Sequence, residues 1–227
     1  MSLITAIEPP ASLTEQATAA IRRDILACRL APGAALAEAT LATALGLTKA
    51  PVRAALARLA DEGLVAAIPR RGWTVSLVTV RDIHEVFDLR LILEPEAARR
   101  AAGRVDTREL DRLDAVCAAG YRPEDGDSAI DFLEANRAFH VAVAELSGNA
   151  RLARQIGRLL DESTRMLVLG LSRRDRSGEM AHEHRALIDM LALGRGEDAA
   201  RLMHEQVDES RQMVLAALTA PAAGIPT

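Results

Sequence analysis

Residues 45–65 read LGLTKAPVRAALARLADEGLV and predict a helix with recognisable signals at both ends. Thr48 is a plausible N-cap, and Pro51 suits the first turn, where its missing N–H costs nothing. Gly63 suits the left-handed position that ends many helices. Apolar side chains return at helical spacing on one face: Val52, Leu56 and Leu59. The stretch therefore predicts an amphipathic helix that starts at Thr48 and stops at Gly63.

Two further helices are expected before this one. Residues 13–27 place apolar side chains four residues apart, and Ser12 or Thr14 can cap the start. An Ala-Pro-Gly turn then breaks the chain, and residues 38–44 form a short second helix that closes at Gly46. The second and third helices, joined by a short turn, predict a helix-turn-helix.

After the third helix the pattern changes to two short β-prone runs. Residues 64–68 (LVAAI) and 73–77 (WTVSL) flank Pro-Arg-Arg-Gly at 69–72, which predicts a hairpin with two arginines at its tip. Three helices followed by a basic hairpin form a winged helix-turn-helix. In that layout the second helix of the pair enters the major groove of DNA, and the hairpin reaches the adjacent backbone or minor groove.

Basic residues stand where this layout would meet DNA. Lys49 and Arg53 are four residues apart and share a helix face. Arg53 can offer a bidentate fork to a guanine edge, whereas Lys49 and Thr48 suit phosphate or a single acceptor. A solvated, charged helix explains any one of these residues as well, but explains them less well together with the basic hairpin. The predicted DNA-binding residues are Thr48, Lys49, Arg53, Arg70, Arg71 and Gly72.

The charge balance is that of an acidic protein with one short basic segment. The 227 residues include 28 Lys plus Arg and 32 Asp plus Glu, a net charge of −4. Residues 1–78 hold 8 basic and 6 acidic residues, which leaves 20 and 26 for the remainder, so the two parts carry +2 and −6. The basic segment is residues 48–72, where Asp61 and Glu62 are the only acidic residues against Lys49, Arg53, Arg58, Arg70 and Arg71, and a charge excess of three is often only a solvated face. Aromatic residues make up 2% of the chain, which excludes a mechanism that stacks many bases or sugars on rings.

The segment over about residues 12–78 resembles the winged-helix domain of the GntR family of bacterial transcription regulators, which implies DNA binding. The resemblance is specific because many spaced positions match in order. Ala39 departs from the family pattern where a basic residue is frequent, and Lys49 and Ala50 replace the more usual Arg and Thr. These departures bear on the operator sequence, not on the DNA-binding role. The matching positions are residues 30–33, 36–38, 41–42, 45–56, 58–59, 62–65, 71–72 and 75.

Composition predicts a globular protein of the cytoplasm. Apolar residues make up 49% and charged residues 26%, and no apolar run approaches the roughly 20 residues of a membrane span. Glu8 and two prolines stand where a signal peptide would have a continuous apolar segment. Cys28 and Cys117 form no Cys-x-x-Cys pair, which argues against a disulfide framework or a thiolate zinc site. We expect both cysteines to be small buried residues.

From residue 80 onward the spacing is helical, which predicts an all-α bundle that could hold a ligand between its helices. Glu94-Pro95 makes the first of these helices long or broken, and Gly194 and Gly196 separate the last two. The expected helices span residues 80–102, 107–119, 127–147, 149–172, 178–194 and 196–218. The expected fold is mostly α, with a winged helix-turn-helix at 10–78, a helical effector-binding and dimerisation domain at 79–219 and a tail at 220–227.

Three histidines of the bundle could meet at one metal ion. His140 lies one turn after Asn136, so the two side chains share a face. His184 and His204 lie on the last two helices, which a short loop would make antiparallel neighbours. Three imidazoles and one oxygen ligand suit a first-row divalent metal, although a single His is more often a hydrogen-bonded core or surface residue. His182 is two residues from His184 and therefore on a different face.

The same region resembles the helical effector domain, called FCD, of the FadR branch of the GntR family, on residues 88–90, 93–95, 136–140, 183–187 and 203–204. The resemblance implies zinc, nickel or manganese and a small organic acid that completes the metal shell. The ligands it implies here are Asn136, His140, His184 and His204. Relatives frequently have Asp at position 136, so an ion held by this set keeps its full double charge. We expect the metal to bind weakly until a carboxylate effector supplies an oxygen and compensating charge.

Arg90 is a candidate for holding the far end of that acid through charge-assisted hydrogen bonds. An ion pair with a nearby carboxylate such as Glu94, one helical turn later, is the alternative for Arg90.

The sequence as a whole predicts a ligand-responsive transcription regulator rather than an enzyme. The expected role is a repressor of a catabolic operon that binds an inverted repeat of double-stranded DNA as a homodimer, since two-fold symmetry doubles the contacts of one recognition helix. A metalloenzyme with an accessory winged helix is the alternative. The sequence gives this alternative little support, because it contains no His-Glu-x-x-His motif, no Glu-rich di-metal pattern and no nucleophile with an evident base. A purely structural interaction module would leave the three histidines without a role.

Overall fold

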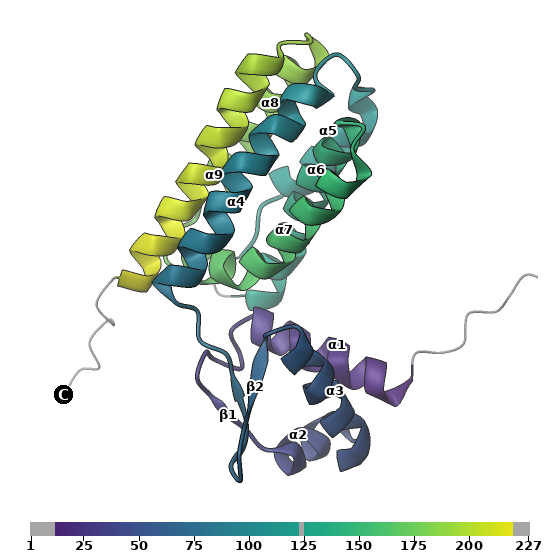
Figure 1. Cartoon of the computed structure of the whole chain (residues 1–227), viewed down its shortest axis with the longest axis vertical. Coiled ribbons are helices and arrows are strands. Elements are labelled where there is room, and N and C mark those ends of the chain that lie inside the picture. Colours follow the sequence, from purple (N-terminus) through teal and green to yellow (C-terminus); the bar gives the residue numbers. More distant parts are fainter. Residues whose placement is uncertain (1–11, 123–124, 220–227) are drawn as a thin grey trace, which may run out of the picture. The chain divides into compact units, whose positions relative to one another are not determined.

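The computed structural model describes residues 12–122 and 125–219 (Figure 1). The chain divides after Leu77 into two compact units, next to the predicted boundary between residues 78 and 79. The predicted tail at 220–227 and the first two residues of the predicted DNA-binding domain, 10 and 11, lie outside the described residues.

The first unit contains the three predicted helices, with ends within two residues of those expected: α1 (Leu13–Leu26), α2 (Glu38–Leu45) and α3 (Lys49–Asp61). Ser12 caps α1 in a capping box, because its Oγ accepts from the N–H of Glu15 and the Glu15 carboxylate accepts from the N–H of Ser12. Gly46 ends α2 in the left-handed conformation, as expected. Thr48 occupies the N-cap position of α3, but its side chain makes no capping hydrogen bond.

A three-stranded antiparallel sheet completes this unit, in the order β1-β3-β2. The predicted hairpin is present as β2 (Val65–Ile68) and β3 (Gly72–Val75), with Ile68 paired to Gly72 next to the turn. No local pattern predicts β1 (Ala35–Leu36), which pairs with the other side of β3. The sheet and helices enclose one apolar core: Ala17, Ile21, Ile25, Leu36, Ala42, Val52, Ala55, Leu56, Leu59, Val65 and Val75.

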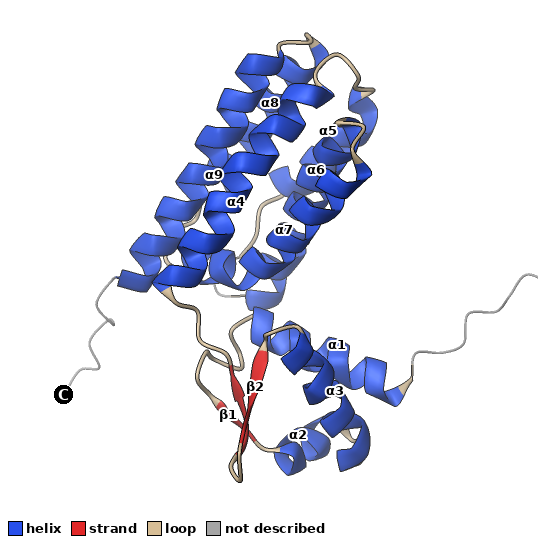
Figure 2. Ribbon diagram, in the orientation of Figure 1, coloured by secondary structure: helices blue, strands red, loops and turns tan. Residues whose placement is uncertain are grey.

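The second unit consists of six helices, and its described residues contain no strand (Figure 2). The helix ends again lie within two residues of those predicted. Together with the winged-helix unit, this confirms the mostly α fold. The helices are α4 (Val80–Ala101), α5 (Thr107–Ala118), α6 (Gly126–Leu146), α7 (Ala150–Leu171), α8 (Ser177–Ala192) and α9 (Gly196–Thr219).

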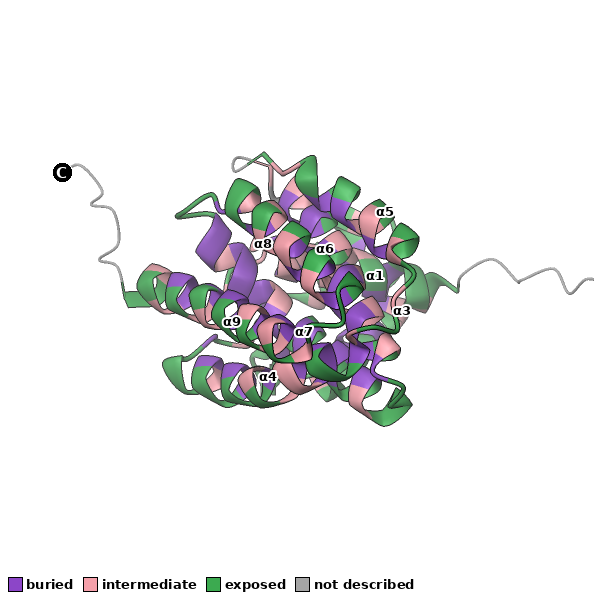
Figure 3. Cartoon of the chain, turned by 90° about the horizontal axis from the view of Figure 1, so that it is seen from above, coloured by how far each residue is buried: buried purple, intermediate pink, exposed green. Residues whose placement is uncertain are grey.

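The longest helices of this unit pack side by side around a shared interior. α4 lies along α9, and α6 lies along α7 (Figure 1). Their buried residues form stripes, with exposed residues on the opposite faces (Figure 3). α4 is not broken at Pro95, although proline supplies no N–H to the helical ladder there. A single uninterrupted α4 therefore carries Arg90 and Glu94 into the interior.

The expectation that both cysteines are buried is confirmed for one of them. Neither cysteine forms a disulfide, but only Cys117 is fully buried, while Cys28 is partly exposed. Burial raises the pKa of the Cys117 thiol to about 12. Among the described helices, none is both long and apolar enough to cross a bilayer.

Candidate functional site

The exposed face of α3 carries the residues predicted to meet DNA. Val52, Leu56 and Leu59 are buried in the core of the unit. Lys49 and Arg53 are exposed, as is Thr48 immediately before the helix. The amphipathic pattern thus fixes which side of α3 is available, and the N-terminal turn presents positive charge next to unpaired backbone N–H groups. This arrangement is suited to binding an anionic backbone.

Arg53 is held in place by Glu38 of α2. Its Nε lies 3.0 Å from both carboxylate oxygens and its Nη2 lies 2.8 Å from Oε2. Trp73 of β3 donates from its indole Nε1 to the same carboxylate at 3.2 Å. The Arg53 hydrogen bond is the largest influence on the pKa of Glu38, which is lowered. No local pattern identifies Glu38 as a functional residue, because its contacts lie 15 and 35 residues away in the chain.

The tip of the β2–β3 hairpin presents the two predicted arginines. Arg70 and Arg71 are both exposed. The turn is closed by a hydrogen bond from the Arg71 N–H to the Ile68 carbonyl oxygen at 3.0 Å. Gly72 has φ +93°, and a Cβ there would lie 3.3 Å from the carbonyl oxygen of Leu36 in β1. Glycine at 72 therefore allows both the turn and the close approach of β1.

A second set of polar residues is buried in the helical unit, and it starts from an ion pair on α4. Arg90 Nε donates to Glu94 Oε1 at 2.6 Å, with both side chains 2% exposed. Arg90 Nη1 also donates to Ser163 Oγ of α7 at 3.2 Å, and the guanidinium lies 4.9 Å from the centre of the Phe87 ring. The structure therefore contains the ion pair that was the alternative for Arg90.

Glu94 connects this pair to His140 on α6. His140 Nδ1 lies 2.7 Å from Glu94 Oε2. Burial by itself raises the pKa of Glu94, but Arg90 and then His140 outweigh burial and lower the pKa to about 2. An ionised carboxylate only accepts, so Nδ1 carries the proton. Asn136, one turn earlier on α6, is buried, and its Oδ1 has no hydrogen-bond partner.

His184 of α8 lies beside His140, with ring centroids 5.6 Å apart. Its ring stacks on Phe139 at 3.9 Å between centroids. Burial lowers the pKa of His184 to about 4, against the opposing effect of Asp114, so the imidazole is neutral at pH 7. Asp114 Oδ1 lies 3.6 Å from Nδ1, just beyond hydrogen-bonding distance, and neither ring nitrogen has a partner. We call Arg90, Glu94, Asp114, Asn136, His140, Ser163 and His184 the buried polar cluster.

His204 does not join this cluster, which corrects the predicted set of four ligands. It is exposed on α9, whereas Gln206 is only 4% exposed. Two residues on a helix are about 200° apart, so these side chains leave opposite faces. The buried positions of α9 include Met203 and Val207, and this spacing already places 206 inside and 204 outside. His182 is also exposed, on a different face from His184, as predicted.

The donors that remain fit a metal ion less well than three imidazoles would. Among residues 12–122 and 125–219, no group of three or more His, Cys, Asp or Glu side chains is arranged to share a metal. The observation in favour is that each histidine has a carboxylate near Nδ1, hydrogen-bonded in His140 and 3.6 Å away in His184, and a carboxylate is the usual second partner of a metal-binding imidazole. Any ion here would depend on His140, His184 and neutral amide oxygens such as Asn136 Oδ1.

Buried polar atoms without partners gather in the helical unit. The described part of the first unit has none. Such atoms are uncommon and call for an explanation such as a bound ligand, ion or water. They are Asp114 Oδ1, Asn136 Oδ1, Arg176 Nη1, Glu183 Oε2, both ring nitrogens of His184, both amide atoms of Gln206, and Arg211 Nε.

Comparison with protein families places both units in known groups. Residues 13–75 match the family described as bacterial regulatory proteins, gntR family, and residues 85–209 match the FCD domain. Among curated proteins, the chain is 26% identical over 147 residues to the HTH-type transcriptional repressor RspR of Escherichia coli K12, a match that covers 65% of this chain and 64% of that protein. The match thus spans slightly less than two thirds of that relative's length.

Another relative is the probable D-xylose utilization operon transcriptional repressor of Paenarthrobacter nicotinovorans, 30% identical over 79% of this chain and 78% of its own length. Solved structures share the fold. McbR/YncC of E. coli has a TM-score of 0.71 and 24% identity over 92% of this chain and all of that one. A GntR-type protein from Rhodococcus sp. RHA1 has a TM-score of 0.71 and 23% identity over 91% of this chain and 99% of its own.

Proposed function

Because the chain belongs to the GntR family of bacterial transcription regulators and carries an FCD domain, we propose that it is a ligand-responsive repressor of a catabolic operon. It binds an inverted repeat as a homodimer, with one recognition helix in each half-site. Relatives named as repressors or operon regulators support this assignment, and favour it over a metalloenzyme. A regulator of this kind acts on the chromosome, which places it in the cytoplasm.

In this proposal α3 enters the major groove and the hairpin contacts the adjacent backbone. Arg53 reads a base edge, while Lys49 and Thr48 contact phosphate at the N-terminus of α3. Arg70, Arg71 and the Gly72 backbone follow the phosphates or the minor groove. The exposed positions of these residues on one helix face and one hairpin tip support the assignment. Ala39 adds no charge from α2, so operator affinity depends on fewer cations than in relatives with a basic residue there.

The effector, a small carboxylic acid, binds at the buried polar cluster. The observation that carries this step is the set of buried, unpartnered polar atoms, because its N–H donors can pair with a carboxylate and its oxygens can face a cation or a hydroxyl group of the ligand, which offsets their desolvation cost. Arg90 is the arginine of the cluster, and Glu94 links it to His140. Since Glu94 already neutralises Arg90, a bound acid needs either a further cation or donors such as Arg176 Nη1 and Gln206 Nε2.

A divalent metal ion is the further cation in this proposal, with His140, His184 and Asn136 as its ligands. When bound, the ion supplies positive charge and open positions for a carboxylate oxygen. With two imidazoles and no carboxylate ligand, this chain holds the ion more weakly than a site with Asp and three His, so acid and metal bind together. The acid alters DNA binding by favouring one of two arrangements of the dimer, and only to the extent that it binds them unequally.

The test is native mass spectrometry and elemental analysis of the purified full chain, followed by metal titration with and without a panel of aliphatic, hydroxy and sugar acids. We expect little metal in the chain alone and tighter metal binding when an active acid is present. Release of the chain from operator DNA by the same acid would complete the assignment. Equal metal affinity with and without every acid would contradict the coupling, and the absence of any DNA binding would contradict the regulator itself.

A further inference from the structure

We propose that Glu38 is a positioning residue for DNA recognition: it orients Arg53 toward a base and removes its net attraction for phosphate. The inference rests on the proposed contact of Arg53 with DNA. It goes further, because it proposes that the Glu38 carboxylate, which touches no nucleic acid, determines the preference of the protein for specific over non-specific DNA.

The geometry leaves one edge of Arg53 available. Glu38 engages Nε and Nη2, at 3.0 and 2.8 Å, and no contact of Nη1 is found within the described residues. The carboxylate is itself fixed from a second side by the Trp73 indole at 3.2 Å. The end of the guanidinium formed by Nη1 and the outer hydrogen of Nη2 is therefore free to meet the two acceptors of a guanine. The Arg53 side chain is 67% exposed and Glu38 only 20%, so the arginine projects outward from a partly buried support.

Three elements that are distant in sequence converge to build this support. Glu38 is the first residue of α2, Arg53 lies in the second turn of α3, and Trp73 is in β3. Trp73 also packs against the apolar core of the unit, so the carboxylate is tied to the rigid part of the fold. An arginine that is held in this way loses less side-chain entropy when it binds than a free one does.

The charges determine what the held arginine can attract. Hydrogen bonding from Arg53 lowers the pKa of Glu38, so the carboxylate is ionised at neutral pH and the pair carries no net charge. A neutral pair gains little from the uniform negative charge of a phosphate backbone, which dominates non-specific affinity. It still offers directed N–H donors, which is what base readout requires. Glu38 thus favours sequence readout over general attraction.

The experiment compares Glu38→Gln with Glu62→Gln in the full chain. Glu62 makes a comparable forked ion pair with Arg22, Nη2 to Oε1 at 2.5 Å, and removing its charge changes the unit equally. Glu62 follows the far end of α3, about 20 Å along the helix from Lys49. The probes are a duplex selected from a random pool by the unmodified protein and a scrambled duplex of the same composition. Fluorescence anisotropy measures both affinities at several salt concentrations.

We expect Glu38→Gln to bind the scrambled duplex more tightly, with a salt slope steeper by about one, since Arg53 now neutralises a phosphate. The ratio of selected to scrambled affinity should fall by about tenfold, within what one bidentate base contact supplies. Trp73→Phe should shift the ratio in the same direction by less. Glu62→Gln should leave the ratio unchanged, and thermal unfolding should show that all variants are folded.

Two results separate the inference from the function on which it rests. If Arg53→Ala lowers the ratio but Glu38→Gln behaves like Glu62→Gln, then Arg53 reads DNA without help from Glu38 and the inference is wrong. If Arg53→Ala changes nothing, the assigned DNA contact is wrong as well. In an Arg53→Ala background, Glu38→Gln should have no further effect on the ratio, and a full additional loss there would also overturn the positioning role.

Discussion

Arg53 and Arg90 are each paired with a glutamate, and burial gives the two pairs different consequences. Arg53 is 67% exposed and keeps one edge of its guanidinium for a ligand. Arg90 is 2% exposed, and its guanidinium donates hydrogen bonds to Glu94 and Ser163. A buried ion pair is held by its partners on both sides and is costly to break, whereas an exposed pair can exchange partners. The exposed Arg53 pair suits recognition, and the buried Arg90 pair suits a fixed interior.

Replacing Arg53 with alanine should weaken binding to a selected operator by roughly ten- to a hundredfold, the range expected for loss of a bidentate base contact. On a scrambled duplex the loss should be no larger than for Arg58→Ala, because each substitution removes one positive charge. Arg58→Ala is the matched control, since it removes the same charge from the opposite end of α3. Competition binding measures both duplexes. Equal losses for the two variants would show that Arg53 supplies only general charge.

Replacing Arg90 with methionine should lower the free energy of unfolding by about 3–5 kcal/mol, because Glu94 would remain buried without its main counter-charge. Urea denaturation followed by circular dichroism gives the change. Arg81→Met on the same helix removes an exposed partner of Glu85 and should change little. The double variant Arg90→Met/Glu94→Gln should recover part of the loss. Similar losses of unfolding free energy for Arg90→Met and Arg81→Met would mean that the buried pair stabilises the fold no more than the exposed pair does.

At the level of helices and strands, the sequence predicts what local signals encode. Capping residues and glycines mark helix ends, so Ser12, Gly46 and Gly63 located three helices to within two residues. The strand β1 has only two residues and is defined by pairing with β3, almost forty positions later, which no local pattern reveals. Pro95 predicts a possible break because proline removes a backbone hydrogen bond from a helix, but α4 packs along α9 and is continuous.

In the candidate site, too, local spacing predicts some residues, whereas contacts between distant elements determine others. The one-turn spacing of Asn136 and His140 and the place of His184 on a later helix predict a shared site, and all three side chains belong to the buried polar cluster. His204 is predicted from its place on the last helix and from the resemblance, although the apolar spacing of α9 puts it outside. Partners such as Glu38 and Asp114 could not be found, since each acts across a contact between elements that are distant in sequence.

The start of α9 provides a prediction about packing between helices. A Cβ on Gly196 would lie 2.9 Å from the carbonyl oxygen of Arg99 near the end of α4, closer than the backbone permits. Gly196→Ala should therefore destabilise the helical unit by about 1–3 kcal/mol, the usual cost of overpacking. Gly178→Ala is the control, because a Cβ there meets nothing within 4 Å. Thermal unfolding should show a lower Tm for the first variant and an equal or higher Tm for the second.

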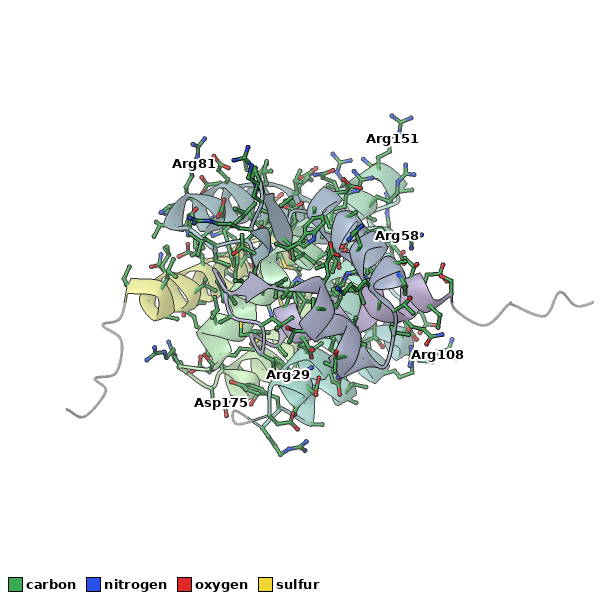
Figure 4. All side chains as sticks on the ribbon, turned by 90° about the horizontal axis from the view of Figure 1, so that it is seen from below. Arg29, Arg58, Arg81, Arg108, Arg151 and Asp175 are labelled. Atoms are coloured by element: carbon green, nitrogen blue, oxygen red, sulfur yellow. The ribbon has the colours of Figure 1, made fainter. Side chains whose placement is uncertain are left out.

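At the level of the whole molecule, charge is divided between the two parts of the chain. Residues 1–78 carry +2 and the remainder −6. Many exposed arginines of the helical unit are paired on their own helix or beside its cap, as Arg81 is with Glu85 and Arg108 with Asp106. Figure 4 shows these labelled arginines projecting outward, where salt screens them. Net attraction for DNA is thus concentrated in the winged-helix unit, and long-range charge in the helical unit opposes non-specific binding.

The most direct test of this account is the binding of the full chain to a duplex selected from a random pool, measured against a scrambled duplex at low and at physiological salt. We predict that two chains bind one selected duplex, that its two half-sites are related by two-fold symmetry, and that the selected duplex is preferred by about a thousandfold or more at physiological salt. No binding even at low salt, or equal affinity for the two duplexes, would contradict the assignment of this protein as a sequence-specific regulator.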